Sequence, residues 1–266
     1  MNRLWPAVAA MAVLTGCASA TADAVRPPPE TGAFDYQLGG AYDVSGLAVV
    51  ARDASQRPQP GAYGICYVNG FQTQPGDGDD WLARHGGAVL RDTSGSPVVD
   101  PDWPDEYVLD PSTPQQRAAI LDVLGPVVKG CAASGFDAVE IDNLDAFTRF
   151  GRIDRSGAFD LARAYVALAH ANGLAIGQKN AAEWAAAGRR DIGFDFAVVE
   201  ECAAYDECAA YADAYGSRVL QIEYADNLPE PFDVVCDAPD RAPLIILRDR
   251  DLVPSGAAGH VYEQCP

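Results

Sequence analysis

The sequence is poor in the residues that bind metals and nucleic acids. Its three histidines (His85, His170 and His260) are far apart, and it contains no CxxC pair. Because structural zinc sites use closely spaced Cys and His ligands, we predict no metal site. Lys and Arg number only 19 against 38 Asp and Glu. This charge balance excludes the classes that bind nucleic acid or anionic membrane surfaces through positive charge.

The N-terminal hydrophobic run is too short to span a bilayer. Residues 4–14 are apolar and follow Arg3, a pattern typical of a signal peptide. The run ends in Leu-Thr-Gly-Cys, which resembles the bacterial lipobox, whose cysteine is lipidated. We predict that residues 1–16 are removed and that Cys17 carries a lipid anchor. A signal peptide with a chance cysteine is the alternative, and both interpretations predict export.

Beyond the signal peptide, the composition indicates a tether followed by one domain. Residues 17–33 are small, polar and Pro-rich, which predicts a flexible linker. Residues 34–266 have a length that suits a single domain, and we expect a monomer. The net charge of −19 is compatible with a cationic substrate, although an acidic surface also keeps an exported protein soluble.

Seven cysteines fit an exported protein. If Cys17 is lipidated, six remain, and an even number outside the cytosol indicates disulfides. Six cysteines can pair in many ways, but Cys202 and Cys208 are close enough to bridge a local loop. Cys66 with Cys131 and Cys236 with Cys265 would then complete the set.

Eight short apolar runs alternate with helical patterns from residue 34 onward. Several runs are continuous and β-branched, which is typical of parallel strands covered on both faces. The predicted strands are 34–38, 47–51, 63–69, 137–143, 175–180, 194–201, 218–224 and 243–249. Because helices separate the strands, we predict an α/β fold, a (β/α)8 TIM barrel in which some helices are short or missing.

Two helices carry clear boundary signals. Thr113 and Gln116 form a capping box at the start of one helix, and Gly135 ends it. Residues 156–172 show a second helical pattern. An open doubly wound sheet is the alternative fold, but it needs a Gly-rich phosphate loop after its first strand. The segment LGGAYD (38–43) is a poor match, and we expect no cofactor.

Polar side chains gather at the C-terminal ends of the predicted strands, where a barrel of this kind has its active site. Neither helical nor strand amphipathicity requires them there. By strand alternation Glu140 and Asp142 share one face, whereas Glu200 and Glu201 point in opposite directions. The candidates include Tyr36, Gln37, Tyr67, Asn69, Gln72, Asn143, Asp145, Gln178, Lys179, Asn180, Glu223 and Tyr224.

Carboxylates that act without histidine, metal or cofactor indicate glycoside hydrolysis. One carboxylic acid protonates the leaving oxygen, and a second carboxylate serves as nucleophile or base. Different local environments can separate the pKa values of the two groups. Aromatic residues near the strand ends could stack on sugar rings, although core packing explains each of them equally well.

Four strand-end segments, in this order, resemble glycoside hydrolase family 114, the endo-α-1,4-polygalactosaminidase type. They are GFDAVEIDNLDAF (135–147), GLAIGQKN (173–180), FDFAVVEECAAYDEC (194–208) and LQIEY (220–224). The resemblance covers about Phe34 to Tyr224 and leaves the residues after Tyr224 without a family signature. It implies a (β/α)8 barrel with a retaining-type acid pair that acts on α-1,4-linked galactosamine polymers.

The resemblance also implies roles for individual residues. Asp142, in the DN motif, corresponds to the catalytic Asp, and Glu200, in Phe-Asp-Phe-Ala-Val-x-Glu-x-Cys, to the catalytic Glu. We expect Asp142 to be the nucleophile and Glu200 the general acid/base, and the resemblance implies a Cys202–Cys208 disulfide. The expected substrate-binding residues are Tyr36, Gln37, Tyr67, Asn143, Asp145, Lys179, Asn180, Glu223 and Tyr224. A polymer with free amines is cationic, so an acidic domain would attract it.

Three segments depart from the family pattern. FDYQLGG replaces a Trp-rich first strand, residues 69–74 replace a Ser/Ala/Gly-rich segment with an acid, and Gln178 stands where Leu is common. These departures leave two other hypotheses open. One is a non-catalytic saccharide-binding lipoprotein on the same barrel. The other is a metal-dependent hydrolase that uses Asp142, Asp145 and Glu200.

Overall fold

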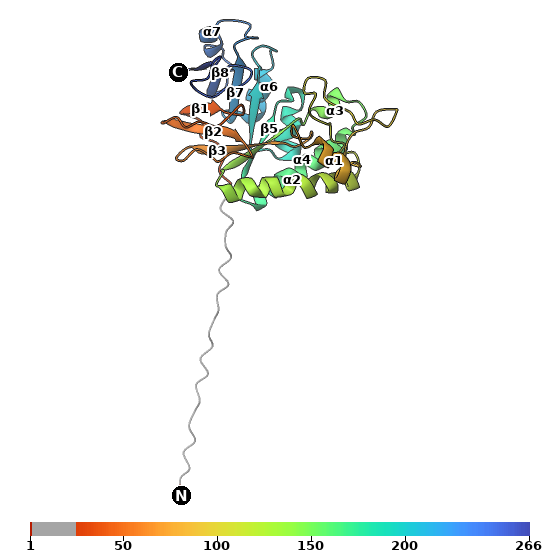
Figure 1. The fold of residues 1–266 in the computed structure, drawn as a ribbon. Coiled ribbons are helices and arrows are strands. Elements are labelled where there is room, and N and C mark those ends of the chain that lie inside the picture. Colours follow the sequence, from red (N-terminus) through yellow and green to blue (C-terminus); the bar gives the residue numbers. More distant parts are fainter. Residues whose placement is uncertain (2–24) are drawn as a thin grey trace.

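Nine strands form one sheet that curls into a nearly closed barrel (Figure 1). The computed structural model describes residue 1 and residues 25–266, so the predicted signal peptide, the lipobox and Cys17 lie outside the described residues. The first eight strands pair in parallel, each with the next, and the ninth pairs antiparallel with the eighth. Because strand order follows chain order, the TIM-barrel prediction is confirmed and the doubly wound alternative is excluded.

All eight predicted strands are present, with ends that shift by a few residues at most. They are β1 (Ala33–Tyr36), β2 (Leu47–Asp53), β3 (Tyr63–Asn69), β4 (Ala138–Asp142), β5 (Ala175–Lys179), β6 (Phe196–Glu200), β7 (Val219–Tyr224) and β8 (Leu244–Arg248). The ninth strand, β9 (Tyr262–Gln264), has no counterpart among the predictions. A three-residue strand is too short to show a readable alternation.

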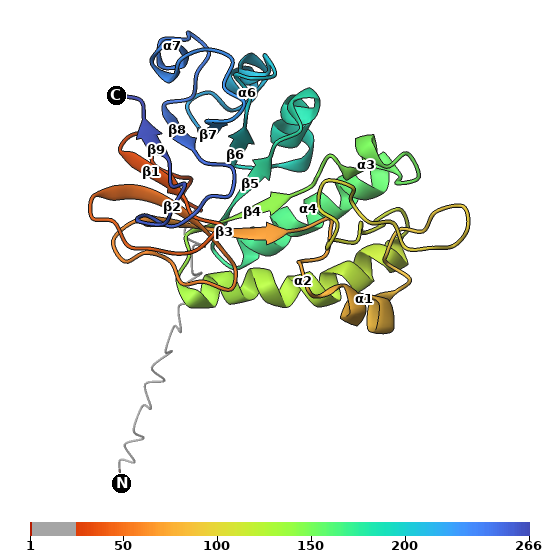
Figure 2. The same ribbon diagram turned by 45° about the horizontal axis from the view of Figure 1, so that its top comes forward.

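The helices lie outside the strands, and some are short, as predicted. The two longest, α2 (Pro114–Ser134) and α4 (Arg155–Ala171), run side by side along one flank of the barrel (Figure 2). The others are α1 (Gly78–His85), α3 (Ala146–Arg149), η1 (Ala182–Trp184), α5 (Ala185–Ala187), η2 (Gly188–Ile192), α6 (Cys208–Tyr215) and α7 (Phe232–Cys236). Among the described residues, no helix has the length and apolar character needed to cross a bilayer.

Local signals set the helix boundaries. The backbone N–H of Gln116 donates to Thr113 Oγ1 at 3.3 Å, and the N–H of Thr113 donates to Gln116 Oε1 at 2.9 Å. This is the capping box that the sequence predicts for α2. Gly135 follows the helix with φ +91°, a conformation that glycine adopts without strain. The α4 helix ends at Ala171, close to the predicted end.

Strand alternation divides the core into two layers. Side chains inside the barrel include Phe34, Ile65, Val198 and Ile222. The opposite faces of the same strands pack against the helices, with Val139 and the other outward residues against the apolar side of α2 and α4. Because both faces are buried, the strands are continuous apolar runs that become polar only at their C-terminal ends.

Three disulfides link the described cysteines, in the pairs that the sequence suggests. Cys66–Cys131 ties β3 to α2, Cys202–Cys208 closes the loop after β6, and Cys236–Cys265 ties α7 to the C-terminal segment. Cross-links of this kind stabilise a fold mainly by restricting the unfolded chain.

Part of the predicted tether lies against the N-terminal end of the barrel. Arg26 Nη2 donates to Asp137 Oδ1 at 2.9 Å, just before β4 begins. The Tyr63 hydroxyl, at the start of β3, donates to the backbone carbonyl of Arg26 at 2.6 Å. Residues 25–33 therefore approach the barrel from the end opposite to the carboxyl ends of its strands.

Side chains close the seam between β1 and β8, which are adjacent in space but not paired as strands. Arg248, fully buried, donates to Asp35 Oδ1 at 2.7 Å and to the backbone carbonyl of Tyr36. From β9, the Tyr262 hydroxyl donates to the backbone carbonyl of Phe34 at 2.8 Å. The backbone N–H of Phe34 donates to Gln264 Oε1 at 3.1 Å. The seam therefore depends on a buried ion pair.

We predict that Arg248→Met lowers the free energy of unfolding by about 3–5 kcal/mol, because it leaves the Asp35 carboxylate buried without a counter-charge. Urea unfolding at neutral pH measures the loss. The control, Arg152→Met, changes an exposed arginine and is expected to stay within about 0.5 kcal/mol of wild type. Equal stability of the two variants would show that the seam does not depend on this ion pair.

Candidate active site

Five neighbouring strands direct polar side chains into the mouth of the barrel at their C-terminal ends. The residues are Tyr67 on β3, Asp142 on β4, Lys179 on β5, Glu200 on β6 and Tyr224 on β7. All five were expected in the site from the sequence. Each lies on the inward face of its strand, because the alternation that fills the barrel with apolar residues continues to the strand end.

Three of these strands end in a sharp change of direction directly after the polar residue. Asn143, Asn180 and Glu201 have φ values of +64°, +47° and +59°. Asparagine tolerates this left-handed region better than most residues, whereas glutamate adopts it at a cost. The turns lead the chain away at once and leave the side chains of the preceding residues at the rim of the barrel.

Lys179 lies between the two predicted catalytic carboxylates. Its Nζ is 3.1 Å from Asp142 Oδ2 and 2.9 Å from Glu200 Oε2. The lysine side chain is only 2% exposed, whereas the carboxylates are 17% and 21% exposed. The ammonium also lies 5.6 Å from the ring centroids of both Tyr36 and Tyr67, within cation–π distance. The carboxylates thus reach solvent while a buried cation joins them from below.

Further donors hold Asp142 in place. The Tyr67 hydroxyl donates to Asp142 Oδ2 at 2.9 Å, and the backbone N–H of Asn143 donates to Oδ1 at 2.7 Å. The Asn143 amide in turn donates to Asn69 Oδ1 at 3.0 Å, which ties the end of β4 to the end of β3. Both oxygens of Asp142 therefore have a fixed direction.

Glu200 is held by a different set of donors. The Tyr224 hydroxyl donates to Oε1 at 2.5 Å, and Asn180 Nδ2 donates to Oε2 at 3.1 Å. The backbone N–H of Glu200 donates back to Asn180 Oδ1 at 2.8 Å. Its neighbour Glu201 points the other way and forms an ion pair with Arg250 at 2.8 Å. As strand alternation predicts, only one of the two glutamates faces the site.

The buried cluster shifts the pKa values of its members. Burial opposes the charge on Lys179, but Asp142 and Glu200 outweigh that effect and raise its pKa. Burial also opposes ionisation of Glu200, but the Lys179 ammonium, the Tyr224 hydroxyl and Asn180 hold its pKa below the ordinary value. In the free protein, therefore, a charged lysine faces an ionised Glu200.

The shared lysine limits the separation of the two acids. Since one Nζ contacts both carboxylates at 3.1 and 2.9 Å, Asp142 Oδ2 and Glu200 Oε2 lie at most about 6 Å apart. Carboxyl groups about 5–5.5 Å apart are typical of retaining glycosidases, whereas inverting enzymes need about 6.5–9.5 Å. This limit on the distance between the two oxygens is compatible with a retaining pair.

A long loop between β3 and α2 adds acids that strand-end reasoning missed. Glu106 is buried, and its Oε2 accepts from Asn69 Nδ2 at 2.7 Å. Burial raises the pKa of Glu106 to about 7. Nothing in the sequence pattern distinguishes it, because the loop has no periodicity from which its direction could be inferred. The same loop and the β6–α6 loop carry exposed aromatic rings, Trp103 and Tyr205.

Asp145 joins the rim through Arg149. The Arg149 guanidinium binds Asp145 Oδ2 at 3.1 Å and also Asp100, a fully buried acid of the β3–α2 loop. It donates to Asn143 Oδ1 at 2.7 Å as well. Burial raises the pKa of Asp145 although Arg149 lowers it. This ion-pair network connects the residues that follow β4 to the β3–α2 loop, beside Asp142.

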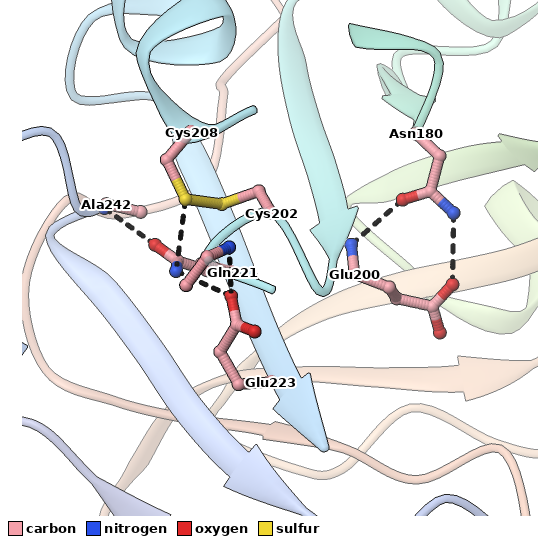
Figure 3. The surroundings of a disulfide bond; sticks show 8 residues. Asn180, Glu200, Cys202, Cys208, Gln221, Glu223 and Ala242 are labelled. Carbon is pink, nitrogen blue, oxygen red and sulfur yellow. Dashed lines mark hydrogen bonds between the residues drawn. A yellow bond between two sulfur atoms is a disulfide. The ribbon is translucent and has the colours of Figure 1, made fainter. Parts of the chain in front are cut away.

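Two predicted substrate-binding residues lie away from this cluster. Gln37 binds Asp35 at 2.8 Å and Arg52 at 2.9 Å, so its amide is engaged at the seam. Glu223 faces outward, where Oε1 accepts from Gln221 at 2.8 Å beside the Cys202–Cys208 disulfide. Figure 3 shows Glu223 with the disulfide and Glu200 apart from it with Asn180. The structure does not bring Gln37 or Glu223 together with the acid pair.

Gln178, one of the departures from the family pattern, also faces outward. Its Oε1 accepts from the Tyr215 hydroxyl of α6 at 2.7 Å, and its Nε2 donates to the carbonyls of Asn180 and Ala181. It therefore supports the turn that positions Asn180 and does not line the mouth of the barrel.

The arrangement is unfavourable for a cation between the acids. The Lys179 ammonium already occupies the space between Asp142 and Glu200 and would repel a divalent ion there. Among residues 25–266, one group of His, Cys, Asp or Glu ligand atoms lies close enough to hold a metal, namely Cys202, Cys208 and Glu223. Its two cysteines form a disulfide and offer no thiolate.

Two carboxylates fixed on different strands at the mouth of a barrel form the arrangement that glycosidases use. The chain belongs to the glycoside-hydrolase family GH114, whose model matches residues 15–266. The resemblance inferred from the strand ends is thus confirmed, and the match extends to the C-terminal residues that lacked a recognisable signature.

Solved structures share the fold. Ega3 of Aspergillus fumigatus, in a complex with galactosamine, has a TM-score of 0.71 and 20% identity, over 91% of this chain and 98% of that one. The glycoside hydrolase domain of PelA from Pseudomonas aeruginosa has a TM-score of 0.57 and 17% identity, over 85% and 98%. Among curated proteins no sequence matches significantly. The TM-scores show a common fold, and at identities this low the similarity shows the fold alone.

We predict that Lys179→Met destabilises the protein by about 2–4 kcal/mol at pH 7, because two neighbouring carboxylates lose their shared counter-ion. Lys179 lowers the pKa of Glu200, so its stabilising effect is present at neutral pH and is lost as Glu200 takes up a proton on acidification. The deficit should therefore shrink from pH 7 toward pH 3. Chemical unfolding across this range measures it.

The matched control is Lys129→Met, since Lys129 is exposed on α2 and is the other of the chain's two lysines. It is expected to leave the free energy of unfolding within about 0.5 kcal/mol of wild type. A deficit in Lys179→Met that did not vary with pH would contradict the role given to the ion pair.

Proposed function

We propose that this protein is an exported glycosidase that hydrolyses α-1,4-linked galactosamine-type polysaccharides, as endo-α-1,4-polygalactosaminidases do. One observation carries the proposal. Asp142 and Glu200, from separate strands, share one buried lysine at the mouth of a barrel of a glycoside-hydrolase family. Their limited separation supports a double-displacement reaction with retention of configuration.

In this mechanism Asp142 attacks the anomeric carbon while Glu200 protonates the leaving glycosidic oxygen. Water, deprotonated by Glu200, then releases the sugar from Asp142 and regenerates both groups. Lys179 binds both carboxylates in the free protein and so disfavours a proton on Glu200. A sugar bound at the mouth would remove water from Glu200, which disfavours its charged form and so favours the proton that it donates, while Lys179 remains the counter-ion of Asp142.

The charge of the chain supports a cationic polymer as substrate. The net charge is −19, and the two partly exposed carboxylates at the mouth share only one positive charge, that of Lys179. A polymer with free amino groups would be attracted over a distance that shortens as salt is added. Galactosamine is bound by the similar Ega3. The exposed rings of Trp103 and Tyr205 lie on loops that leave the carboxyl ends of strands and could stack on sugar rings.

Export follows from the predicted signal peptide and fits the three disulfides, which form in oxidising compartments. The Leu-Thr-Gly-Cys segment supports a lipid anchor at Cys17. With the anchor the protein would stay on the cell envelope as a monomer, and without it the domain would be secreted.

The proposal is tested with residues 18–266 as a soluble protein. We expect new reducing ends from purified α-1,4-galactosamine polymer, and fewer from its N-acetylated form, which lacks the positive charge. Glu200→Gln should lower the rate by about 10²–10⁴-fold and Asp142→Asn by at least as much. Asp122→Asn, at an exposed site on α2, should leave the rate unchanged. Polymer binding without any new reducing ends would indicate a saccharide-binding protein instead.

Azide can distinguish the two catalytic roles. With an aryl glycoside of an α-1,4-galactosamine oligomer, azide should restore turnover to Glu200→Ala and give a glycosyl azide of the substrate's configuration. In Asp142→Ala the azide would attack directly and give the opposite configuration. NMR of the products identifies the anomer. The reverse pattern would exchange the roles of the two residues.

A further inference from the structure

A third acid lies beneath the catalytic pair and has no role in the proposed reaction. Glu140 precedes Asp142 by two residues on β4 and shares its inward face. It is fully buried inside the barrel, between Tyr67 of β3 and Gly177 of β5 in the register of the sheet. A buried carboxyl group without a charged partner is costly, so its retention calls for a physical explanation.

Glu140 is only half satisfied by its neighbours. The Tyr36 hydroxyl donates to Glu140 Oε1 at 2.7 Å, whereas Oε2 is buried without a hydrogen-bond partner among the described residues. The Tyr36 ring faces the Lys179 ammonium at 5.6 Å. Tyr36 thus joins Glu140 to the lysine that holds both catalytic acids.

The charged groups around Glu140 are those of the active site. Lys179 on β5 is positive, and Asp142 on β4 and Glu200 on β6 are acidic; Tyr36 on β1 and Tyr67 on β3 are phenols that burial keeps protonated. Burial raises the pKa of Glu140 to about 7, although Lys179 and the Tyr36 hydrogen bond lower it. Glu140 therefore changes charge near neutral pH.

We infer that Glu140 is a positioning residue for the catalytic acid. Its negative charge attracts the Lys179 ammonium and repels a negative charge on Glu200. Glu200 therefore keeps its proton as the solution becomes alkaline. This inference rests on the proposed glycosidase function. The interaction is electrostatic and requires no contact between Glu140 and the substrate.

Glu140→Gln tests the inference in the activity assay. Glutamine keeps the size and the oxygen that accepts from Tyr36 but cannot ionise. The alkaline limb of the kcat profile should therefore shift toward acid by about one pH unit, with a small change in the maximum rate. A limb at the wild-type pH would overturn the inference. Glu223→Gln removes another fully buried acid, outside the barrel, and should leave the limb in place.

Tyr36→Phe provides a second variant in which Glu140 itself remains. Without the hydroxyl, Glu140 ionises at higher pH, so less negative charge lies beneath the acid pair at any given pH. The limb should move in the same direction as in Glu140→Gln. If Glu140→Gln does not fold, Tyr36→Phe decides the matter alone, and an unchanged limb in this variant would also overturn the inference.

A stability measurement separates this inference from the proposed function. A carboxyl whose pKa rises from 4.5 to about 7 on folding stabilises the folded state in its protonated form, and this contribution is lost as pH rises through that range. The melting temperature of wild type minus that of Glu140→Gln should therefore decrease as the pH is raised from 5 to 8. A constant difference would overturn the inference. If the difference falls but wild type cleaves no polymer, the glycosidase proposal fails, and the inference fails with it.

Discussion

One buried ammonium group organises the candidate active site. Lys179 is taken out of water at a considerable cost, and the two carboxylates at its sides compensate for that cost. In return the lysine fixes their separation, lowers the pKa of Glu200 and links both acids to the phenol rings beneath. The other polar contacts at the mouth orient the two acids. Tyr67 and Asn143 orient Asp142, and Tyr224 and Asn180 orient Glu200.

The sequence could predict features that depend on local or periodic patterns. Continuous apolar runs locate all eight parallel strands, because a strand buried on both faces must be apolar throughout. The capping box at Thr113 locates the start of α2, since it satisfies donors within four residues. The neighbours of Asp142 and Glu200 at the mouth were predictable because parallel strands of one barrel end on the same side.

Other features depend on contacts between distant residues, which the pattern does not reveal. The seam joins residues near 35 to residues near 250 through Arg248 and β9. Glu106 reaches the rim from a loop without periodicity. Glu223 stands next to Tyr224, and the alternation that separates Glu200 from Glu201 separates these two as well. Applied consistently, it would have directed Glu223 to the outer face.

The place where the N-terminal segment meets the barrel leaves the mouth open on its own side. Arg26 binds Asp137 at the end of the barrel opposite to Asp142 and Glu200. The described N-terminal segment therefore joins the barrel at the end away from its mouth. A long, stiff polysaccharide fibre could lie across the mouth without meeting this segment.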